Sequence, residues 1–177
     1  MADLVIENIV VSTQLTGPVD LQKVSTAVPG TTYTPNEVPA VMFHIDAPKA
    51  VVMLFADGHA MITGVRSTDE IEIILDLIAK KLSVVGHTIS EEPLVTSHQV
   101  IGSVDLRRPL DVRALAKRLS NATYNPRCFP GIIYKTEDPN AVILLFHTGK
   151  VVCSATTIDE VSRAVQNIQE KLSSLGV

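Results

Sequence analysis

The sequence predicts an α+β protein built from two similar repeats. Moving residues 6–64 by 91 positions places them on residues 97–155 without a gap, and 14 of the 59 positions are identical. Each repeat shows the same order of elements: a long strand, a short helix, three further strands and a long helix. Self-similarity at a fixed spacing indicates a duplicated structural unit. We expect the repeats to occupy residues 1–92 and 93–177.

The first strand and the short helix of each repeat follow from the apolar pattern. Runs rich in valine and isoleucine at residues 4–15 and 94–106 predict long strands. A proline follows each run, and apolar residues at spacings of three and four then predict an amphipathic helix. These apolar residues are Leu21, Val24 and Val28 in the first repeat and Val112, Leu115 and Leu119 in the second.

Three short strands and a long helix complete each repeat. Gly58 and Gly149 lie between the last two strands, as tight hairpin turns require. Ser67 and Thr157, each followed three residues later by a glutamate, have the spacing of a capping box and predict where the long helices begin. The strands are expected at residues 38–45, 50–55 and 59–65, and at residues 129–136, 141–146 and 150–155.

One face of the predicted sheet has no cover. Helices with a single apolar stripe can pack against only one side of the strands. The opening strand is nevertheless apolar on both sides, with Val10 on one and Ile9 and Val11 on the other. An exposed apolar patch of this kind normally marks an interaction surface.

Composition excludes several classes of protein. No apolar run reaches the ~20 residues needed to cross a bilayer, and no signal peptide is visible, so we expect a soluble, intracellular protein. Cys128 and Cys153 both lie in the second repeat and are expected to be free thiols. Metal-ligand spacings, a glycine-rich phosphate loop and a duplicated carboxylate pair are all missing. The sequence therefore predicts no enzyme, no cofactor and no metal site.

Charge distinguishes the two repeats. Residues 1–92 contain 5 Lys or Arg and 12 Asp or Glu, a net charge of −7, whereas residues 93–177 contain 10 and 7, a net charge of +3. Drift of surface charge after duplication explains this difference as well as a functional cause does. The functional interpretation is that the second repeat supplies most of the attraction to a polyanion.

Several features together resemble the TATA-binding protein family. They are the phrase Glu7-Asn8-Ile9-Val10, the Tyr-x-Pro before Phe129-Pro130-Gly131-Ile132-Ile133-Tyr134, the Leu-Phe-x-x-Gly-Lys of residues 145–150, and the duplication. The resemblance covers residues 4–176 and is stronger in the second repeat. It implies a saddle in which ten strands form one curved antiparallel sheet and four helices cover its convex face.

The resemblance also implies a function. The family comprises general transcription initiation factors that lay the concave face in the minor groove of A·T-rich promoter DNA. Kinking the duplex with phenylalanine wedges is a known property of this family. Double-stranded DNA, a transcription factor of the TFIIB class and the RNA polymerase machinery are therefore the expected partners.

The four wedge positions of the family are not all phenylalanine here. They fall on Val38, Phe55, Phe129 and Phe146. Val38 departs from the pattern, because its short branched side chain cannot reach between bases as a ring does. Phe43 is expected on the opposite side of its strand and does not substitute for it.

Other positions of the family's DNA site fall on polar, small and basic residues. The central asparagine pair falls on Asn8 and Gln99, and the positions of the two family lysines in the first repeat hold His44 and His59, which bind phosphate less well when neutral. Contacts to the groove floor are expected from Val10, Thr63, Ile101 and Ser154, and contacts to phosphates from Arg66, Lys135 and Lys150.

The expected docking site for the TFIIB-class factor also departs from the family. Its acidic and apolar positions fall on Asn125, Arg127 and Cys128. A basic residue where an acidic one is expected puts the usual docking in doubt or implies a partner of opposite charge.

Two other interpretations stay open from the sequence. One is an interaction or regulatory protein of the same fold with weakened or lost DNA binding, which Val38, Gln99 and the acidic first repeat permit. The other is a duplicated small-ligand binder with the sheet around an apolar cavity. The lack of a long N-terminal extension favours an archaeal, cytoplasmic protein over a nuclear one.

Overall fold

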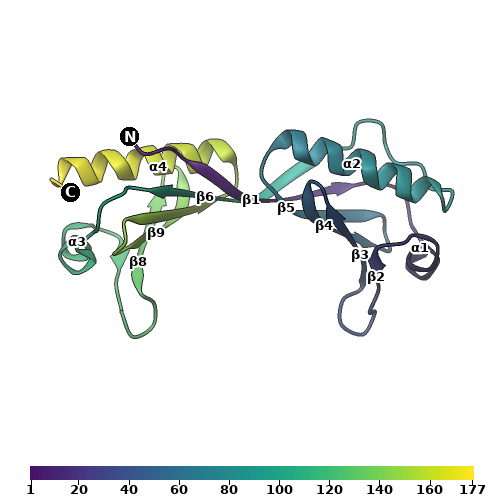
Figure 1. The fold of residues 1–177 in the computed structure, drawn as a ribbon, viewed down its shortest axis with the longest axis horizontal. Coiled ribbons are helices and arrows are strands. Elements are labelled where there is room, and N and C mark those ends of the chain that lie inside the picture. The colour runs from purple at the N-terminus through teal and green to yellow at the C-terminus, as the bar shows by residue number, and fades with distance from the viewer. The chain divides into compact units, whose positions relative to one another are not determined.

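A computed structural model describes all residues from 1 to 177. Ten strands form one hydrogen-bonded sheet in the order β2-β3-β4-β5-β1-β6-β10-β9-β8-β7, and four helices accompany it (Figure 1). The α+β class, the ten-stranded antiparallel sheet and the four helices are thus confirmed. The elements are β1 (Val5–Gln14), α1 (Leu21–Ala27), β2 (Thr31–Thr32), β3 (Ala40–Asp46), β4 (Lys49–Phe55), β5 (His59–Val65), α2 (Thr68–Ser83), β6 (Val95–Asp105), α3 (Val112–Arg118), β7 (Ala122–Thr123), β8 (Gly131–Glu137), β9 (Asn140–Phe146), β10 (Lys150–Ala155) and α4 (Ile158–Ser174).

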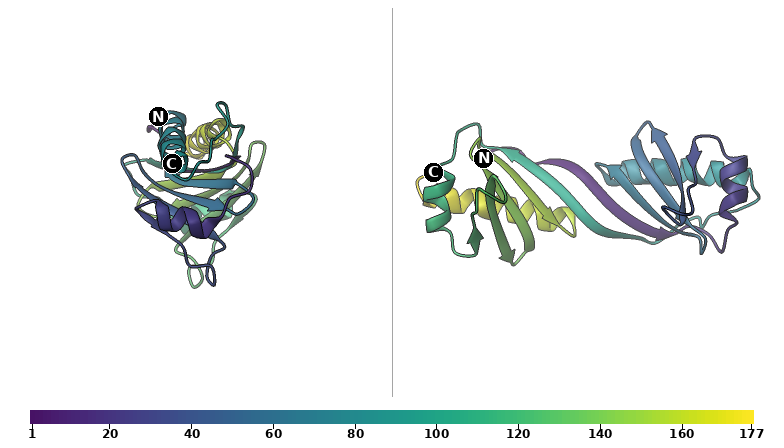
Figure 2. Two further views of the ribbon diagram at one scale, coloured as in Figure 1. Left: turned by 90° about the vertical axis from the view of Figure 1, so that its right-hand side faces the viewer. Right: turned by 90° about the horizontal axis from the view of Figure 1, so that it is seen from below.

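The chain divides into two compact units. The first unit contains residues 8–98, and the second unit contains residues 1–7 together with residues 99–177. In each unit the long helix lies along one face of the strands, α2 in the first and α4 in the second, as the view from below shows (Figure 2). No helix of the protein is long and apolar enough to cross a membrane.

Strand alternation separates a covered face from an open face in each unit. On β4, Ala50, Val52 and Leu54 are at most 4% exposed, whereas the residues between them are half-buried. On β9, Ala141, Ile143 and Leu145 are likewise buried. Because side chains alternate across a strand, the buried set packs under the helices and the other set lies on the opposite side. We call that opposite side the open face.

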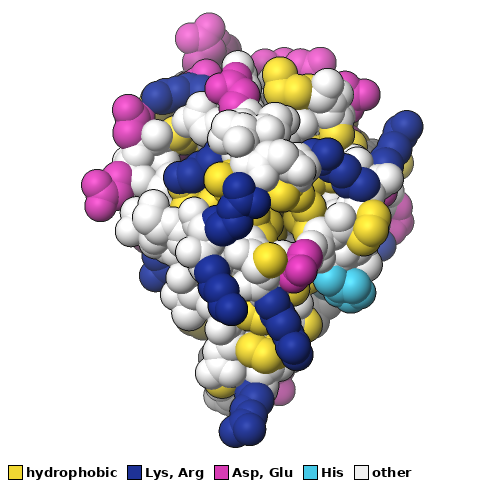
Figure 3. Space-filling view, turned by 90° about the vertical axis from the view of Figure 1, so that its left-hand side faces the viewer, with side chains coloured by type: hydrophobic (Ala, Val, Ile, Leu, Met, Phe, Trp, Pro, Cys, Tyr) yellow, Lys and Arg dark blue, Asp and Glu magenta, His cyan; other side chains and the backbone are white.

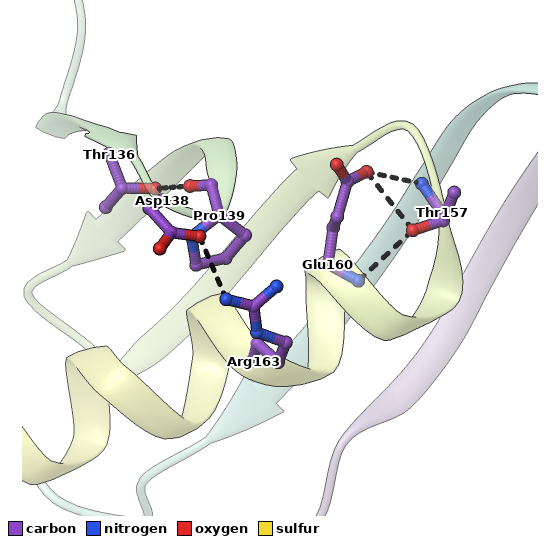
Figure 4. A network of polar contacts seen from close by, with 6 residues as sticks. All are labelled: Thr136, Asp138, Pro139, Thr157, Glu160 and Arg163. Atoms are coloured by element: carbon purple, nitrogen blue, oxygen red, sulfur yellow. Dashed lines mark hydrogen bonds and ion pairs between the residues drawn. The ribbon is translucent and has the colours of Figure 1, made fainter.

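The long helices begin where the sequence predicts, but with different caps. At the start of α4, Thr157 Oγ1 accepts from the Glu160 amide at 3.2 Å and the Glu160 carboxylate accepts from the Thr157 amide at 3.0 Å (Figure 4). At the start of α2, Ser67 Oγ accepts from the Glu70 amide. The Glu70 carboxylate, however, accepts from the Arg66 amide at 2.6 Å. The prediction of a full capping box at Ser67 is therefore wrong, because the amide just after β5 binds the carboxylate instead.

A single ion pair connects α4 to the hairpin beside it. Arg163 Nη2 lies 2.9 Å from Asp138 Oδ1, and Asp138 belongs to the turn between β8 and β9 (Figure 4). Thr136 Oγ1, near the end of β8, donates to the Pro139 carbonyl of the same turn. The first unit has no such ion pair, since Ala47 occupies the position that matches Asp138. The pair is largely exposed, so we expect it to contribute at most about 1 kcal/mol.

The glycine turns are confirmed and their residue type has a steric cause. Gly149 has φ +90°, and a Cβ there would lie 2.0 Å from the Arg108 carbonyl oxygen. Gly58 has φ +84°, and a Cβ there would lie 2.1 Å from the Thr16 carbonyl oxygen. Both the left-handed backbone and the close approach of the neighbouring loop therefore require glycine.

Two strand boundaries differ from the prediction by two residues. β3 begins at Ala40 and β8 at Gly131, two residues later than expected. The Val38 amide instead donates to the Thr34 carbonyl, and the Phe129 amide to the Asn125 carbonyl, so both residues lie in a turn that leads into the strand. The two-residue strands β2 and β7 were not predicted, because two residues are too few to show a period.

Candidate nucleic-acid interface

The open face of each unit carries a row of apolar side chains. Met42 on β3 pairs with Met53 on β4, and Met53 pairs with Met61 on β5, so three half-buried methionines form a row across the first unit. In the second unit the matching row contains Ile133, Leu144 and Val152. The two rows thus occupy matching positions in the fold. The methionine row is the more adaptable of the two, because methionine has an unbranched side chain that adapts to its partner.

A pair of aromatic rings lies at one end of the second unit's row. The rings of Phe129 and Phe146 are 5.7 Å apart between centroids and meet edge to face at 60°. Gly131 lies directly beside them: a Cβ there would lie 3.1 Å from Phe129 Cε1 and 3.2 Å from Phe146 Cδ1. The Leu145 carbonyl oxygen is closer still, at 2.9 Å, so the neighbouring strand and the two rings together leave no room for a side chain at Gly131. Both rings are half-buried and accessible from the open face.

The first unit lacks this arrangement at two positions. Val38 replaces the first ring, and Ala40 pairs with Phe55 as Gly131 pairs with Phe146. The methyl group of Ala40 occupies space that the second unit leaves to the rings. Phe43 is 1% exposed and lies in the core, as expected, so it does not replace the missing ring. Sequence reasoning noticed Val38 but missed Ala40, although the repeat comparison places it opposite Gly131.

The two amide side chains occupy matching positions and make matching hydrogen bonds. Asn8 Nδ2 donates to Thr63 Oγ1 at 3.4 Å, and Gln99 Nε2 donates to Ser154 Oγ at 3.1 Å. Asn8 Oδ1 also accepts from the Gly64 amide at 2.7 Å. Each side-chain NH₂ group keeps a second proton for an outside acceptor. The structure thus brings together two pairs of the predicted site residues.

Two buried serines on the open face were missed by the sequence reasoning. Ser12 Oγ lies 2.5 Å from His98 Nε2, and Ser103 Oγ donates to Glu7 Oε1 at 2.5 Å. The serines are 5% and 7% exposed and occupy equivalent positions of the two repeats. The repeat comparison could have pointed to them, because both equivalent positions hold a serine. Buried polar groups require hydrogen-bond partners. The imidazole of His98 serves the Ser12 hydroxyl in the first unit, and the carboxylate of Glu7 serves the Ser103 hydroxyl in the second.

The basic residues of the predicted site lie mainly in the second unit. Lys135 on β8 and Lys150 on β10 are exposed and unpaired by any acid. His44 and His59 hold the matching positions of the first unit, and His44 Nε2 lies 3.3 Å from Thr32 Oγ1. Arg66 is exposed just beyond β5. Val10 and Ile101 are half-buried and belong to the first strands β1 and β6.

The predicted partner residues lie on the loop between β7 and β8. Asn125, Arg127 and Cys128 are all exposed. Asn125 also shapes this loop, because its side-chain oxygen accepts from the Arg127 amide at 3.2 Å and its carbonyl accepts from the Phe129 amide at 3.0 Å. The residue that positions Phe129 is thus beside the surface that carries Arg127.

These features define a class of protein. They are those of a duplicated α+β protein with one helix-covered face and one open face, and the open face bears rings, amides and cations. The sequence model of the family described as "Transcription factor TFIID (or TATA-binding protein, TBP)" matches residues 3–85 and 95–175. The chain belongs to the TATA-binding protein family.

Individual relatives are similar in sequence to this protein over nearly its whole length. The chain is 36% identical over 176 residues to the TATA-box-binding protein of Thermococcus sibiricus, covering 99% of this chain and 95% of that one. It is 33% identical over 175 residues to TATA-box-binding protein D of Halobacterium salinarum, covering 97% and 94%. The solved structure of Methanococcus jannaschii TBP matches with a TM-score of 0.88 and 28% identity, covering 97% of this chain and 99% of that chain. The family is one of general transcription factors rather than enzymes, so both of these predictions are confirmed.

Proposed function

We propose that this chain binds A·T-rich promoter DNA through the minor groove with its open faces and bends it chiefly with the second unit. The observation that supports this proposal best is the pair of Phe129 and Phe146, two accessible rings held edge to face at the end of an apolar strand row. Ring wedges of this kind part a base step at a cost of a few kcal/mol, which the contact area with bent DNA offsets.

The rest of the open face suits the minor groove of A·T-rich DNA. The groove presents mainly acceptors, adenine N3 and thymine O2, with no donor at an A·T pair. Asn8 and Gln99 are anchored by Thr63 and Ser154 and can donate to such acceptors. An exocyclic amino group of guanine would oppose these donors and the apolar rows. We therefore expect discrimination against G·C pairs.

Phosphate contacts are proposed to be unequal. Lys135 and Lys150 flank the second unit's row, and His44 and His59 flank that of the first. Each phosphate contact releases counterions and strengthens binding at low salt. The proposed complex is thus held more firmly by the second unit. A TFIIB-class factor and the polymerase machinery are proposed partners, in the cytoplasm of an archaeal cell.

A second candidate is an interaction protein of this family with little DNA binding. The Met42, Met53 and Met61 row and the Val38 and Ala40 substitutions favour it, because methionine rows adapt to varied protein partners. This candidate predicts no bending by either unit.

Fluorescence transfer between the two ends of an A·T-rich duplex distinguishes the candidates. At low salt, we expect the wild-type protein to bring the ends closer, and Phe129→Ala/Phe146→Ala to abolish this change. Phe55→Ala serves as the matched control and should retain most of it. If the wild-type protein at micromolar concentration leaves the end-to-end distance unchanged, the proposed function is wrong and the second candidate stands.

A further inference from the structure

The second unit carries a strongly basic segment that DNA binding by the open face does not use. Residues 107–135 contain seven Lys or Arg and a single acid, Asp111. The matching residues 16–44 of the first repeat contain one lysine, Lys23, and two acids. The two segments thus differ by seven units of net charge, which is most of the ten units by which the whole repeats differ.

Six of these cations form what we call the basic end surface. All six are exposed, and none has an ion-pair partner, since the single ion pair of the protein joins Arg163 to Asp138. Lys and Arg side chains run down the middle of this view with apolar side chains between them, whereas Asp and Glu side chains gather mainly along its upper edge (Figure 3). The members of the basic end surface are Arg107, Arg108, Arg113, Lys117, Arg118 and Arg127.

Three of the six cations lie on helix α3, on the side away from the open face. α3 buries Val112 and Leu115 and contacts β7 and β8. On β8, the residues under the helices are Ile132 and Tyr134, which are at most 9% exposed. The exposed residues Arg113, Lys117 and Arg118 therefore lie on the outer side of α3, separated from the open face by the helix and the strand.

We propose that the basic end surface binds an acidic protein segment with apolar residues among its carboxylates. Five of its six cations are arginine, whose planar fork binds carboxylates with two hydrogen bonds and is enriched at protein interfaces. Half-exposed Leu106 directly precedes Arg107, and half-exposed Tyr124 lies within the segment; both offer apolar contacts, which a phosphate backbone would not use. Charge and apolar complementarity together favour a protein over a nucleic acid.

Not every cation of the surface is equally available. Arg108 Nη2 donates to the carbonyl oxygen of Val177, so this guanidinium is already partly engaged. Arg127 lies on the loop whose turn is fixed by Asn125. Arg113, Lys117 and Arg118 make no side-chain contact of this kind and follow each other along one exposed helix, so they are the residues to substitute.

A fluorescein-labelled peptide of about 20 residues, composed of glutamate and leucine, tests the proposal by fluorescence anisotropy at low salt. Arg113→Glu/Lys117→Glu/Arg118→Glu is expected to weaken binding by about tenfold or more, because opposite charges become like charges. The matched control Lys23→Glu/Lys49→Glu/Lys80→Glu changes the net charge equally in the first unit and should change binding less than about twofold. Should the first variant fail to fold, Arg113→Gln/Lys117→Gln/Arg118→Gln replaces it, with a loss of at least about threefold expected.

The other outcomes overturn the proposal. Equal weakening by both variants, or by neither, would show that no local site exists. If a G·C duplex displaces the peptide and binds more tightly, and the α3 variant loses that DNA binding, the surface is a nucleic-acid site instead. The α3 variant should still bend an A·T-rich duplex, so failure of the DNA-binding proposal and failure of this one are separate results.

Discussion

The ring of Phe146 packs edge to face against the ring of Phe129, and Gly131 leaves the space that both rings occupy. In the first repeat the same three positions hold Phe55, Val38 and Ala40. The difference between the two units therefore involves two substitutions, since the lost ring and the added methyl group fall in the same place.

Restoring the missing wedge is expected to require both positions. Val38→Phe alone should place its ring against the Ala40 methyl group and change DNA bending little. Val38→Phe/Ala40→Gly should reproduce the pair of the second unit and increase both affinity, by about threefold or more, and bend angle. Ala40→Gly alone is the control. A single Val38→Phe variant that performs as well as the double variant would show that Ala40 has no part in the difference.

The salt dependence of DNA binding should report the unequal cations. Lys135→Ala and Lys150→Ala are each expected to lower the slope of log affinity against log salt by about 1, because each removes a phosphate contact. His44→Lys/His59→Lys should raise the slope by up to about 2. Lys80→Ala, at an exposed position in the last turn of α2, is the control and should leave the slope unchanged. Equal slopes for all variants would show that the substituted positions do not contact the DNA phosphates.

Substitution of Gly149 in its hairpin turn should destabilise the protein strongly. Gly149→Ala is expected to lower the free energy of unfolding by about 2–4 kcal/mol, because the new Cβ overlaps the Arg108 carbonyl and the backbone has a positive φ. Gly17→Ala is the matched control, since nothing lies within 4 Å of its Cβ position. It should change stability by less than about 0.5 kcal/mol. Urea unfolding followed by circular dichroism measures both. Similar losses would contradict the steric argument.

The two free thiols should differ sharply in reactivity. Burial raises the pKa of the Cys153 thiol from 9.0 to about 11, so it stays protonated and shielded at pH 8, whereas Cys128 is exposed. Only the thiolate reacts quickly with a disulfide reagent. We expect one equivalent of thiol to react in the folded protein and two in urea. Cys128→Ser should leave no fast-reacting thiol in the folded state, and a fast second equivalent in the wild type would show that the core around Cys153 opens.

Much of the fold could be predicted because the repeat appears twice. Two copies of one pattern gave the order of the elements, the turns at Gly58 and Gly149 and the free cysteines. The bonds Ser12–His98 and Ser103–Glu7 could not be predicted, because their partners are 86 and 96 residues apart and only the folded sheet brings them together. The second half of the cap at Ser67 also escaped prediction: the Glu160 carboxylate accepts from the amides of both Thr156 and Thr157, whereas the Glu70 carboxylate accepts from the Arg66 amide.

The proposed DNA site was assigned residue by residue, whereas the packing of its side chains was not predicted. Positions such as Phe129 and Phe146 followed from the family resemblance alone. The contribution of Ala40 depends on a methyl group near a ring, which becomes visible only when β3 is paired with β4. Charge counts over whole repeats likewise did not reveal the basic end surface, because its six cations lie within residues 107–127 of the second repeat.

The central claim is that the two units act unequally on DNA. Its most direct measurement uses 2-aminopurine placed in turn near each end of an A·T-rich site, in duplexes whose orientation on the protein is fixed by cross-linking from Cys128. Fluorescence should rise strongly at the step beside Phe129 and Phe146, where the base is unstacked, and weakly at the step beside Phe55 and Val38. Equal increases at both steps, or none at either, would contradict the account.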